Sequence, residues 1–183
     1  MTSVPAERDQ LFRLARLVLL LAAAEEAHPD GLDVERLGCY AFLADNPLLM
    51  AREEGDPDRL GLLMRGFDDR ALSYASPAQR YVTSLRQLPG DLSRLVGFGL
   101  VGVTVAGRIR YRLTDDGRVL AGQFTALYAD SYADAARVVV GRLRRVSGTK
   151  VRENLRDWLT RKAGTRGGRL DTARSTGFPE DNT

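Results

Sequence analysis

Three arginines alternate with apolar residues in one short segment, and this spacing fits contacts with a phosphate backbone. The arginines are Arg108, Arg110 and Arg112. The apolar residues that alternate with them are Ile109, Tyr111 and Leu113. Because successive side chains of a β-strand point to opposite faces, we expect the arginines on one face and the apolar residues on a core-facing one. Phosphate contacts do not read base sequence. Charged side chains also protect a hairpin edge from unwanted strand pairing, so both roles stay open.

Further basic side chains could extend such a surface. The additional candidates for nucleic-acid contact are Arg80, Arg86, Arg144, Arg145 and Lys150. The net charge of +3 is unevenly spread, because residues 1–136 carry a net charge of −4 and residues 137–174 carry +9. A basic end on a mildly acidic body indicates an anionic partner, which could be nucleic acid or an acidic protein surface.

The side chains needed for catalysis form no recognisable group. The single cysteine, Cys39, and the single histidine, His28, cannot build a disulfide or a closed zinc site. A G-x-x-x-x-G-K-[ST] phosphate loop is missing, and H-E-x-x-H needs two histidines. The carboxylate doublets that begin at Asp68 and Asp115 fit a loop and the first turn of a helix. We therefore expect a chain that is not an enzyme and uses no cofactor or metal.

The length and composition are those of one folded domain with a tail. A chain of 183 residues with 44% apolar and 28% charged residues can bury a sizeable core. We assign residues 1–163 to the domain. Residues 164–183 have too few apolar side chains to pack, and we expect a flexible basic tail there.

The first apolar run is expected to be a buried helix rather than a signal peptide or a membrane span. Arg13 and Arg16 interrupt it, and it is shorter than the roughly 20 residues that cross a bilayer. Leu11, Leu14 and Val18 are spaced as one face of a helix that packs into a core. We expect a cytoplasmic protein without membrane contact.

The apolar periodicity predicts several helices and one hairpin. The expected helices cover residues 7–27, 34–46, 60–72, 77–88 and a short stretch after Asp91. Another helix follows Thr114 and continues, or restarts after Ser131, to about residue 146, and a last helix follows a break at Ser147-Gly148 and reaches Leu159. Asp33, Ser76, Asp91 and Thr114 are the expected N-caps. Pro89 and Gly90 are expected to separate two helices. Asp56 and Asp58 fit a turn better than a metal site.

Two further expectations concern packing. The alternation on both sides of Ala106-Gly107 predicts a β-hairpin, and Leu95 and Val96 just before it are expected to close the core. One face of the last helix carries Leu155, Trp158 and Leu159. Large aromatic side chains anchor cores as readily as interfaces, so this face packs either on the domain itself or on a partner.

The order of elements indicates a mainly α fold with a small β-hairpin, a winged-helix domain with extra N- and C-terminal helices. A helix leads directly into the hairpin, and a capped helix follows it. About thirty residues, 48–76, separate the second helix from the segment before the hairpin. A DNA-reading helix-turn-helix has a turn of about 3–4 residues at this point.

Three segments resemble the middle components of bacterial three-component ABC-ATPase conflict systems, the Lamassu-like group. They are LDVERLGCYAFLADNPLLM, LVGFGLVGVTVAGRIRYRLTDDGRVLA and YADSYADAARVVVGRLRRVSGTKVRENLRDWL. The resemblance runs from Leu11 to Leu159 and rests on apolar spacing, the Asn46-Pro47 stop and the hairpin. It implies a non-enzymatic winged-helix adaptor in a complex with an ATPase similar to structural-maintenance-of-chromosomes (SMC) proteins and an effector such as a nuclease. It implies a role in defence against phage or plasmids, and it provides no catalytic residues.

The alternative function is a winged-helix transcriptional regulator that binds DNA. In that case Arg80 and Arg86 would supply donors for phosphates and guanine edges. The long segment before the hairpin favours the adaptor, in which any DNA contact is independent of sequence.

Overall fold

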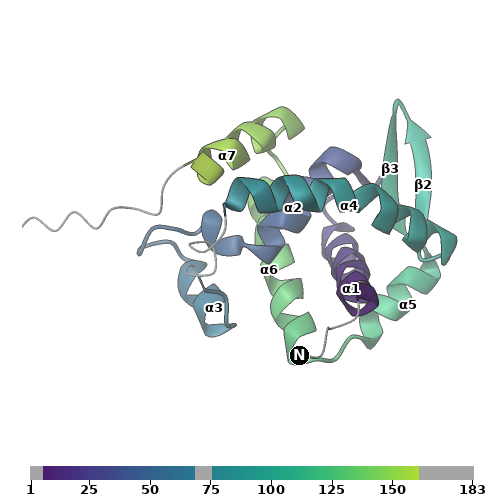
Figure 1. Cartoon of the computed structure of the whole chain (residues 1–183), viewed down its shortest axis with the longest axis horizontal. Helices are drawn as coiled ribbons and strands as arrows, with labels where there is room; N and C mark the ends of the chain where they lie inside the picture. The colour runs from purple at the N-terminus through teal and green to yellow at the C-terminus, as the bar shows by residue number, and fades with distance from the viewer. Residues whose placement is uncertain (1–5, 69–75, 161–183) are drawn as a thin grey trace, which may run out of the picture.

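The periodic apolar segments form seven α-helices, and the alternating segment forms most of a small sheet (Figure 1). The computed structural model describes residues 6–68 and 76–160. The helices are α1 (Ala6–Ala24), α2 (Val34–Asp45), α3 (Arg59–Met64), α4 (Pro77–Gly97), α5 (Asp115–Gln123), α6 (Leu127–Leu143) and α7 (Gly148–Thr160), with a short 3-10 helix η1 (Pro47–Leu49). Strands β1 (Leu32–Asp33), β2 (Val101–Ala106) and β3 (Arg108–Leu113) form an antiparallel sheet in the order β1-β3-β2. The expected class, mainly helical with a hairpin, is confirmed.

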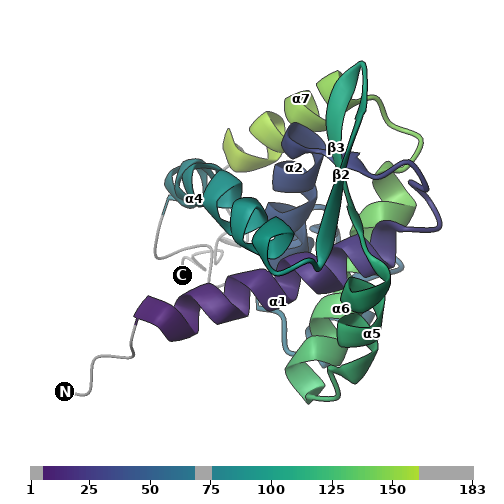
Figure 2. The same ribbon diagram turned by 90° about the vertical axis from the view of Figure 1, so that its right-hand side faces the viewer.

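Helix α1 lies at the centre of the molecule. It contacts α2, α4, α5 and α6, and in Figure 2 it runs between α4 on one side and α5 and α6 on the other. Its residues Leu17, Val18 and Leu20 are buried in a core that also holds the side chains of Tyr40 and Tyr132. No helix in the described part of the chain is long and apolar enough to cross a membrane.

Three of the four expected N-caps, Asp33, Ser76 and Thr114, are confirmed. The Asp33 carboxylate accepts a hydrogen bond from the Arg36 backbone N–H at 2.8 Å. The Ser76 hydroxyl accepts from Gln79 N–H at 3.4 Å, and Thr114 accepts from Gly117 N–H at 3.1 Å. These short-range contacts satisfy donors that have no partner inside the helix.

The hairpin is also confirmed, and a third strand joins it. Register pairs run from Val101 with Leu113 to Ala106 with Arg108, and Gly107 at the turn has a φ of 71°. Strand β1 pairs with β3 and was not predicted, since two residues are too few to show alternation. Gly31 lets the chain at β1 approach β3 closely, because a Cβ atom at residue 31 would lie 2.6 Å from the Tyr111 carbonyl oxygen.

The expected break at Pro89 is wrong, because α4 continues through it from Pro77 to Gly97. Pro89 itself is exposed. On the opposite face, the buried residues of this half of the helix are Leu88, Asp91, Leu92 and Leu95. Asp91 does not begin a helix; its carboxylate pairs with Arg13 of α1, with Nε and Oδ2 2.7 Å apart. Tertiary packing of this face outweighs the local preference of proline.

Three side chains that were expected in the core are exposed. Leu11 is 64% exposed, Ile109 is 53% exposed and Val96 is 38% exposed. The hairpin extends beyond the helical body (Figures 1 and 2), so Leu113 at its base is buried whereas Ile109 near its tip is not.

Other boundaries differ from the prediction. Helix α6 restarts at Leu127 instead of continuing or restarting after Ser131, and α3 ends at Met64. Residues 69–72 of the expected helix, and the expected tail at 164–183, lie outside the described residues.

Candidate functional site

An apolar groove lies between α1, the C-terminal end of α4, α5 and the start of α6. Its volume is about 480 Å³. The side chains that give it its character are Leu11, Phe12, Phe98, Leu120, Phe124 and Tyr128. Of the described residues that line it, Arg16 is the only charged one. Single exposed apolar residues are ordinary on protein surfaces, whereas a contiguous hollow of them is a candidate binding site.

The groove has a rigid floor and an exposed wall. Leu14, Val18 and Leu95 are buried beneath it as part of the core. Phe12 and Tyr128 contact each other edge to face, with ring centroids 5.8 Å apart. Both rings remain more than half exposed. The groove is therefore held open by packing, with its apolar wall in solvent.

Acidic side chains lie close to this groove. Asp130 directly follows Ala129, which lines the groove, and Asp9 is exposed near the start of α1. Asp115 and Asp116 stand in the first turn of α5, where Asp115 pairs with Arg118. Asp9 lines a hollow that shares Phe12, Arg16 and Tyr128 with the groove. Arg13 and Arg16 on the same helix are paired with Asp91 and Asp45. A ligand with a positive edge complements this arrangement.

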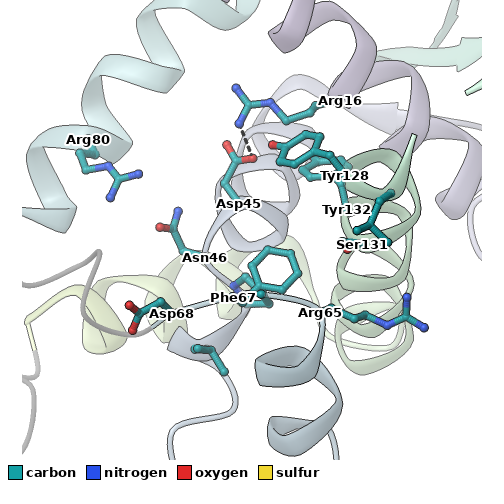
Figure 3. A pocket seen from close by; sticks show the side chains of 14 residues that line it. Arg16, Asp45, Asn46, Arg65, Phe67, Asp68, Arg80, Tyr128, Ser131 and Tyr132 are labelled. Carbon is teal, nitrogen blue, oxygen red and sulfur yellow. Dashed lines mark hydrogen bonds and ion pairs between the residues drawn. The ribbon is translucent and has the colours of Figure 1, made fainter. Parts of the chain in front are cut away.

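A polar pocket of about 500 Å³ adjoins the groove on the other side of Arg16 and Tyr128 (Figure 3). The Arg16 guanidinium donates to the Asp45 carboxylate at 2.7 Å. Burial raises the pKa of Asp45, and the charge of Arg16 opposes that rise. Arg65 is paired with Asp134, and the Asn46 amide donates to the Phe42 carbonyl at 2.8 Å. These polar groups of the pocket find their partners within the chain.

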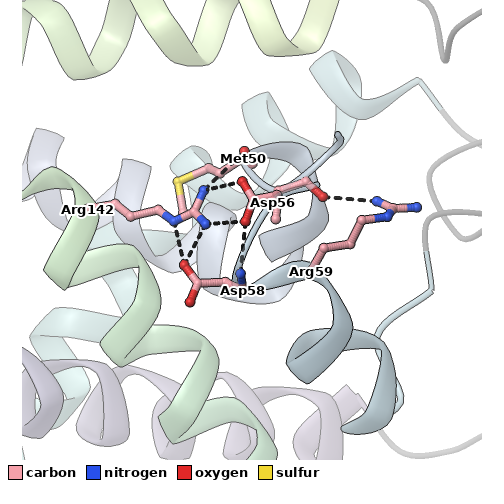
Figure 4. A network of polar contacts seen from close by, with 6 residues as sticks. Met50, Asp56, Asp58, Arg59 and Arg142 are labelled. Carbon is pink, nitrogen blue, oxygen red and sulfur yellow. Dashed lines mark hydrogen bonds and ion pairs between the residues drawn. The ribbon is translucent and has the colours of Figure 1, made fainter. Parts of the chain in front are cut away.

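The loop before α3 is held by Arg142 of α6 (Figure 4). The Arg142 Nε donates to Asp58 Oδ2 at 2.8 Å, and its Nη1 donates to Asp56 Oδ2 at 2.9 Å. These hydrogen bonds lower the pKa of Asp56. The same guanidinium reaches the Met50 carbonyl at 3.3 Å. The Asp58 N–H donates to Asp56 at 3.0 Å, which confirms the expected turn.

Sequence reasoning did not find Arg142, because it lies 84 residues from Asp58 and only the fold brings them together. Within the described residues, no group of three histidine, cysteine or acidic side chains is placed to hold a metal ion.

The hairpin arginines share one face of β3, as alternation predicts. Arg108 has 72% of its side chain exposed and lies 3.9 Å from Asp33. Arg110 is partly buried and donates to the Gly31 carbonyl at 3.4 Å, while Arg112 is exposed. Arg110 and Arg112 line a hollow of about 280 Å³ with Thr104 of the neighbouring strand.

The other basic candidates lie on two further parts of the molecule. Arg80 and Arg86 are exposed in the N-terminal half of α4, and the Arg80 guanidinium points into the polar pocket (Figure 3). Arg144, Arg145 and Lys150 surround the connection from α6 to α7, where Lys150 pairs with Glu153 at 3.2 Å. The candidates therefore occupy the hairpin, α4 and the α6–α7 connection.

The candidate interface residues of α7 pack on the protein's own core. Leu155 is 1% exposed, and Trp158 and Leu159 are partly buried against the same cluster. The Trp158 carbonyl accepts a hydrogen bond from Arg52 at 2.7 Å. Of the two expected roles, packing on the domain's own core is the one that matches these positions. Leu155 is too deeply buried to contact a partner.

Comparison of the chain with protein-family models, with curated proteins and with solved structures finds no match. The groove described above was missed by sequence reasoning. The sequence features that belong to the groove are the adjacent apolar residues Leu11 and Phe12 and the phenylalanine that follows α4, Phe98. None of these has a spacing that distinguishes a groove from a core.

Proposed function

We propose that this chain is a non-enzymatic winged-helix adaptor that binds an SMC-like ABC ATPase in a cytoplasmic defence complex. The element order α1-β1-α2-α4-β2-β3, with η1 and α3 inserted between α2 and α4, and the sheet order β1-β3-β2 support a winged-helix domain. The partners follow from the resemblance of the sequence to the Lamassu-like middle components: the ATPase and an effector such as a nuclease. The chain links the two and acts against phage or plasmids.

The observation that carries the proposal is the apolar groove. An amphipathic helix that lays its apolar face into a groove is a recurring mode of protein recognition. Phe12 of α1 and, from α5 and its C-terminal end, Leu120 and Phe124 supply large apolar contacts to such a helix. Large aromatic and aliphatic anchors in a pocket commonly contribute most of the binding energy.

The occupant is a helix with a basic edge, contributed by the ATPase. Asp9 shares a hollow with the groove residues Phe12 and Tyr128, and the exposed Asp130 follows the groove residue Ala129. Arg16, which lines the groove, and Arg13 on the same helix are already paired with carboxylates. Charge complementarity then selects lysine or arginine beside the apolar face of the partner helix.

Co-purification with the ATPase tests the proposal. The variant is Phe12→Ser, and the matched control is Val119→Ser, because Val119 is similarly exposed on α5 but does not line the groove. We expect Phe12→Ser to weaken binding about thirtyfold, which corresponds to about 2 kcal/mol for an interface anchor. The control should bind as the parent does.

Equal affinity of both variants would contradict the groove as the binding site. The genomic neighbourhood is an independent check, because the proposal requires a gene for an ABC ATPase with long coiled coils. A gene that stands alone beside a divergent promoter would support a transcriptional regulator instead.

A DNA contact is the second candidate function, and the row of arginines on β3 favours it. On the same face, β2 carries Gly102 and Thr104, which are small and leave the arginines accessible. We expect replacement of Arg108, Arg110 and Arg112 by alanine to weaken binding of the assembled complex equally for unrelated duplexes. The slope of log affinity against log salt should fall by about 0.9 per lost phosphate contact.

A loss confined to one DNA sequence would support the regulator, and an unchanged affinity would leave the arginines as solvated edge residues. The adaptor is preferred because a reading helix in α4 would need Arg80 directed at DNA. Its guanidinium points into the polar pocket instead (Figure 3). The thirty-residue connection between α2 and α4 also differs from a short helix-turn-helix turn.

A further inference from the structure

Strand β2 forms an outer edge of the sheet. The order β1-β3-β2 leaves one side of β2 without a neighbouring strand among the described residues, and β2 is the outermost strand in Figure 1. Its sequence VGVTVA holds no charged residue and no proline. Proteins usually protect exposed edges with charges, prolines or bulges. Within the described part of the chain, β2 therefore has neither a charged residue nor a proline to protect its edge.

One face of the hairpin continues the core beyond the helical body. Val101 and Leu113 are buried at its base. Farther out on the same face, the exposed fractions are 45% for Val103, 53% for Ile109 and 78% for Val105. A strand added beside β2 would place side chains next to the two valines. It would therefore satisfy backbone groups and cover apolar surface in one step.

We propose that β2 pairs antiparallel with β2 of a second copy of this chain, so that two sheets join into one. A two-fold axis between the strands brings the apolar face of one copy beside the apolar face of the other. Val103 and Val105 of each copy then lie beside valines of the other. Cross-strand pairs of β-branched residues stabilise sheets.

Charge favours a second copy as the occupant. Because β2 is uncharged, two copies of it meet without like charges in contact. The arginine rows of the two β3 strands are separated by three strand spacings, about 14 Å. This exceeds the Debye length of about 8 Å at physiological salt, so their repulsion is largely screened. A charged strand from another protein would lack the apolar match to Val103 and Val105.

This inference is independent of the proposed adaptor function, because no residue of β2 lines the groove. The test uses the full chain and sedimentation velocity over a wide range of protein concentration. The variant is Val105→Lys, which should leave folding intact because the Val105 side chain is 78% exposed. Val119→Lys on α5 is the matched control, because it introduces the same charge at a similarly exposed valine.

We expect the parent chain to dimerise reversibly as its concentration rises. Val105→Lys should raise the dimer dissociation constant at least about tenfold, because the two-fold axis places each added charge beside a valine of the other copy. Val119→Lys should dimerise as the parent does. Amide hydrogen exchange should slow in residues 101–106 as the dimer forms.

Three results would overturn the inference. The first is a parent chain that stays monomeric at every concentration. The second is a dimer that Val105→Lys leaves intact but Phe12→Ser dissociates, since that dimer would form through the groove. The third is a dimer in which exchange within β2 does not change. The adaptor proposal would survive the first and third of these, because binding at the groove needs no second copy.

Discussion

Two hollows of similar volume lie on opposite sides of the same two side chains, Arg16 and Tyr128, and their chemistry differs. The groove, about 480 Å³, is apolar apart from Arg16. The polar pocket, about 500 Å³, contains the Arg16–Asp45 pair together with Arg65, Asn46 and Arg80. One wall therefore separates an apolar surface from a charged one.

The difference shows how the side chains that line a hollow can find interaction partners without a ligand. Charges in the polar pocket pair with other charges of the chain, such as Arg16 with Asp45 and Arg65 with Asp134. Apolar side chains have no equivalent, since only removal from water stabilises them. The polar pocket accordingly contributes to the stability of the fold, whereas the exposed apolar side chains of the groove gain no such stabilisation from the chain itself.

The largest effect is expected from Arg16→Met, which keeps the aliphatic stem and removes the charge. Asp45, with 29% of its side chain exposed, loses its cation. The free energy of unfolding should fall by about 2–3 kcal/mol, as when a hydrogen bond to a charged, partly buried group is broken. Urea unfolding measures the change.

Arg137→Met is the matched control for that experiment. Arg137 also pairs with an aspartate, Asp134, but 65% of its side chain is exposed. Its loss should cost no more than about 0.5 kcal/mol. If the two variants were equally stable, the Arg16–Asp45 pair of the polar pocket would stabilise the fold no more than an exposed ion pair does.

A smaller effect, dependent on pH, is expected from Asp56→Asn. The Arg142 clamp holds the loop before α3, and the segment after α3 carries Arg65 and Phe67 into the polar pocket. Since Arg142 lowers the pKa of Asp56 in the folded state, the stabilisation is complete above the unfolded pKa of about 4 and is lost as pH falls through the lowered value. We expect a loss of about 1 kcal/mol at neutral pH.

The difference in unfolding free energy between Asp56→Asn and the parent should therefore shrink below about pH 4. Glu53→Gln, an exposed carboxylate of the same loop, is the control and should follow the parent across the range. A difference that persisted unchanged in acid would show that the clamp does not depend on the charge of Asp56.

The smallest effect is expected in the groove. Leu11→Gln and Phe98→Gln change side chains that are each 64% exposed, so unfolding free energy should stay within about 0.5 kcal/mol of the parent. Binding of an apolar fluorescent dye should decrease at the same time. A loss of stability above about 1 kcal/mol would mean that these residues serve the fold rather than a partner.

Local signals predicted much of the secondary structure. Asp33 and Thr114 cap helices through atoms three residues away, and the hairpin follows from alternation across Gly107. These features depend on neighbours along the chain, which the sequence displays directly. The shared face of the three arginines was predictable for the same reason.

Features that depend on distant contacts were not predictable. The helix that continues through Pro89 is supported by the Arg13–Asp91 pair, whose members are 78 residues apart. Leu11 fits a core spacing, but the groove beside it is built by α1, α4, α5 and α6 together. Periodicity indicates which face of a helix is apolar, and it does not indicate whether another element covers all of that face.

The clamp formed by Arg142, Asp56 and Asp58 has an evolutionary consequence. A guanidinium that bridges two carboxylates across 84 and 86 residues of chain couples the substitution histories of three positions. Loss of either aspartate weakens the selection on Arg142, and loss of Arg142 leaves two neighbouring negative charges to repel each other. In diverging descendants of this chain we expect the three to be retained or replaced together, while the exposed residues at 53–55 drift in identity.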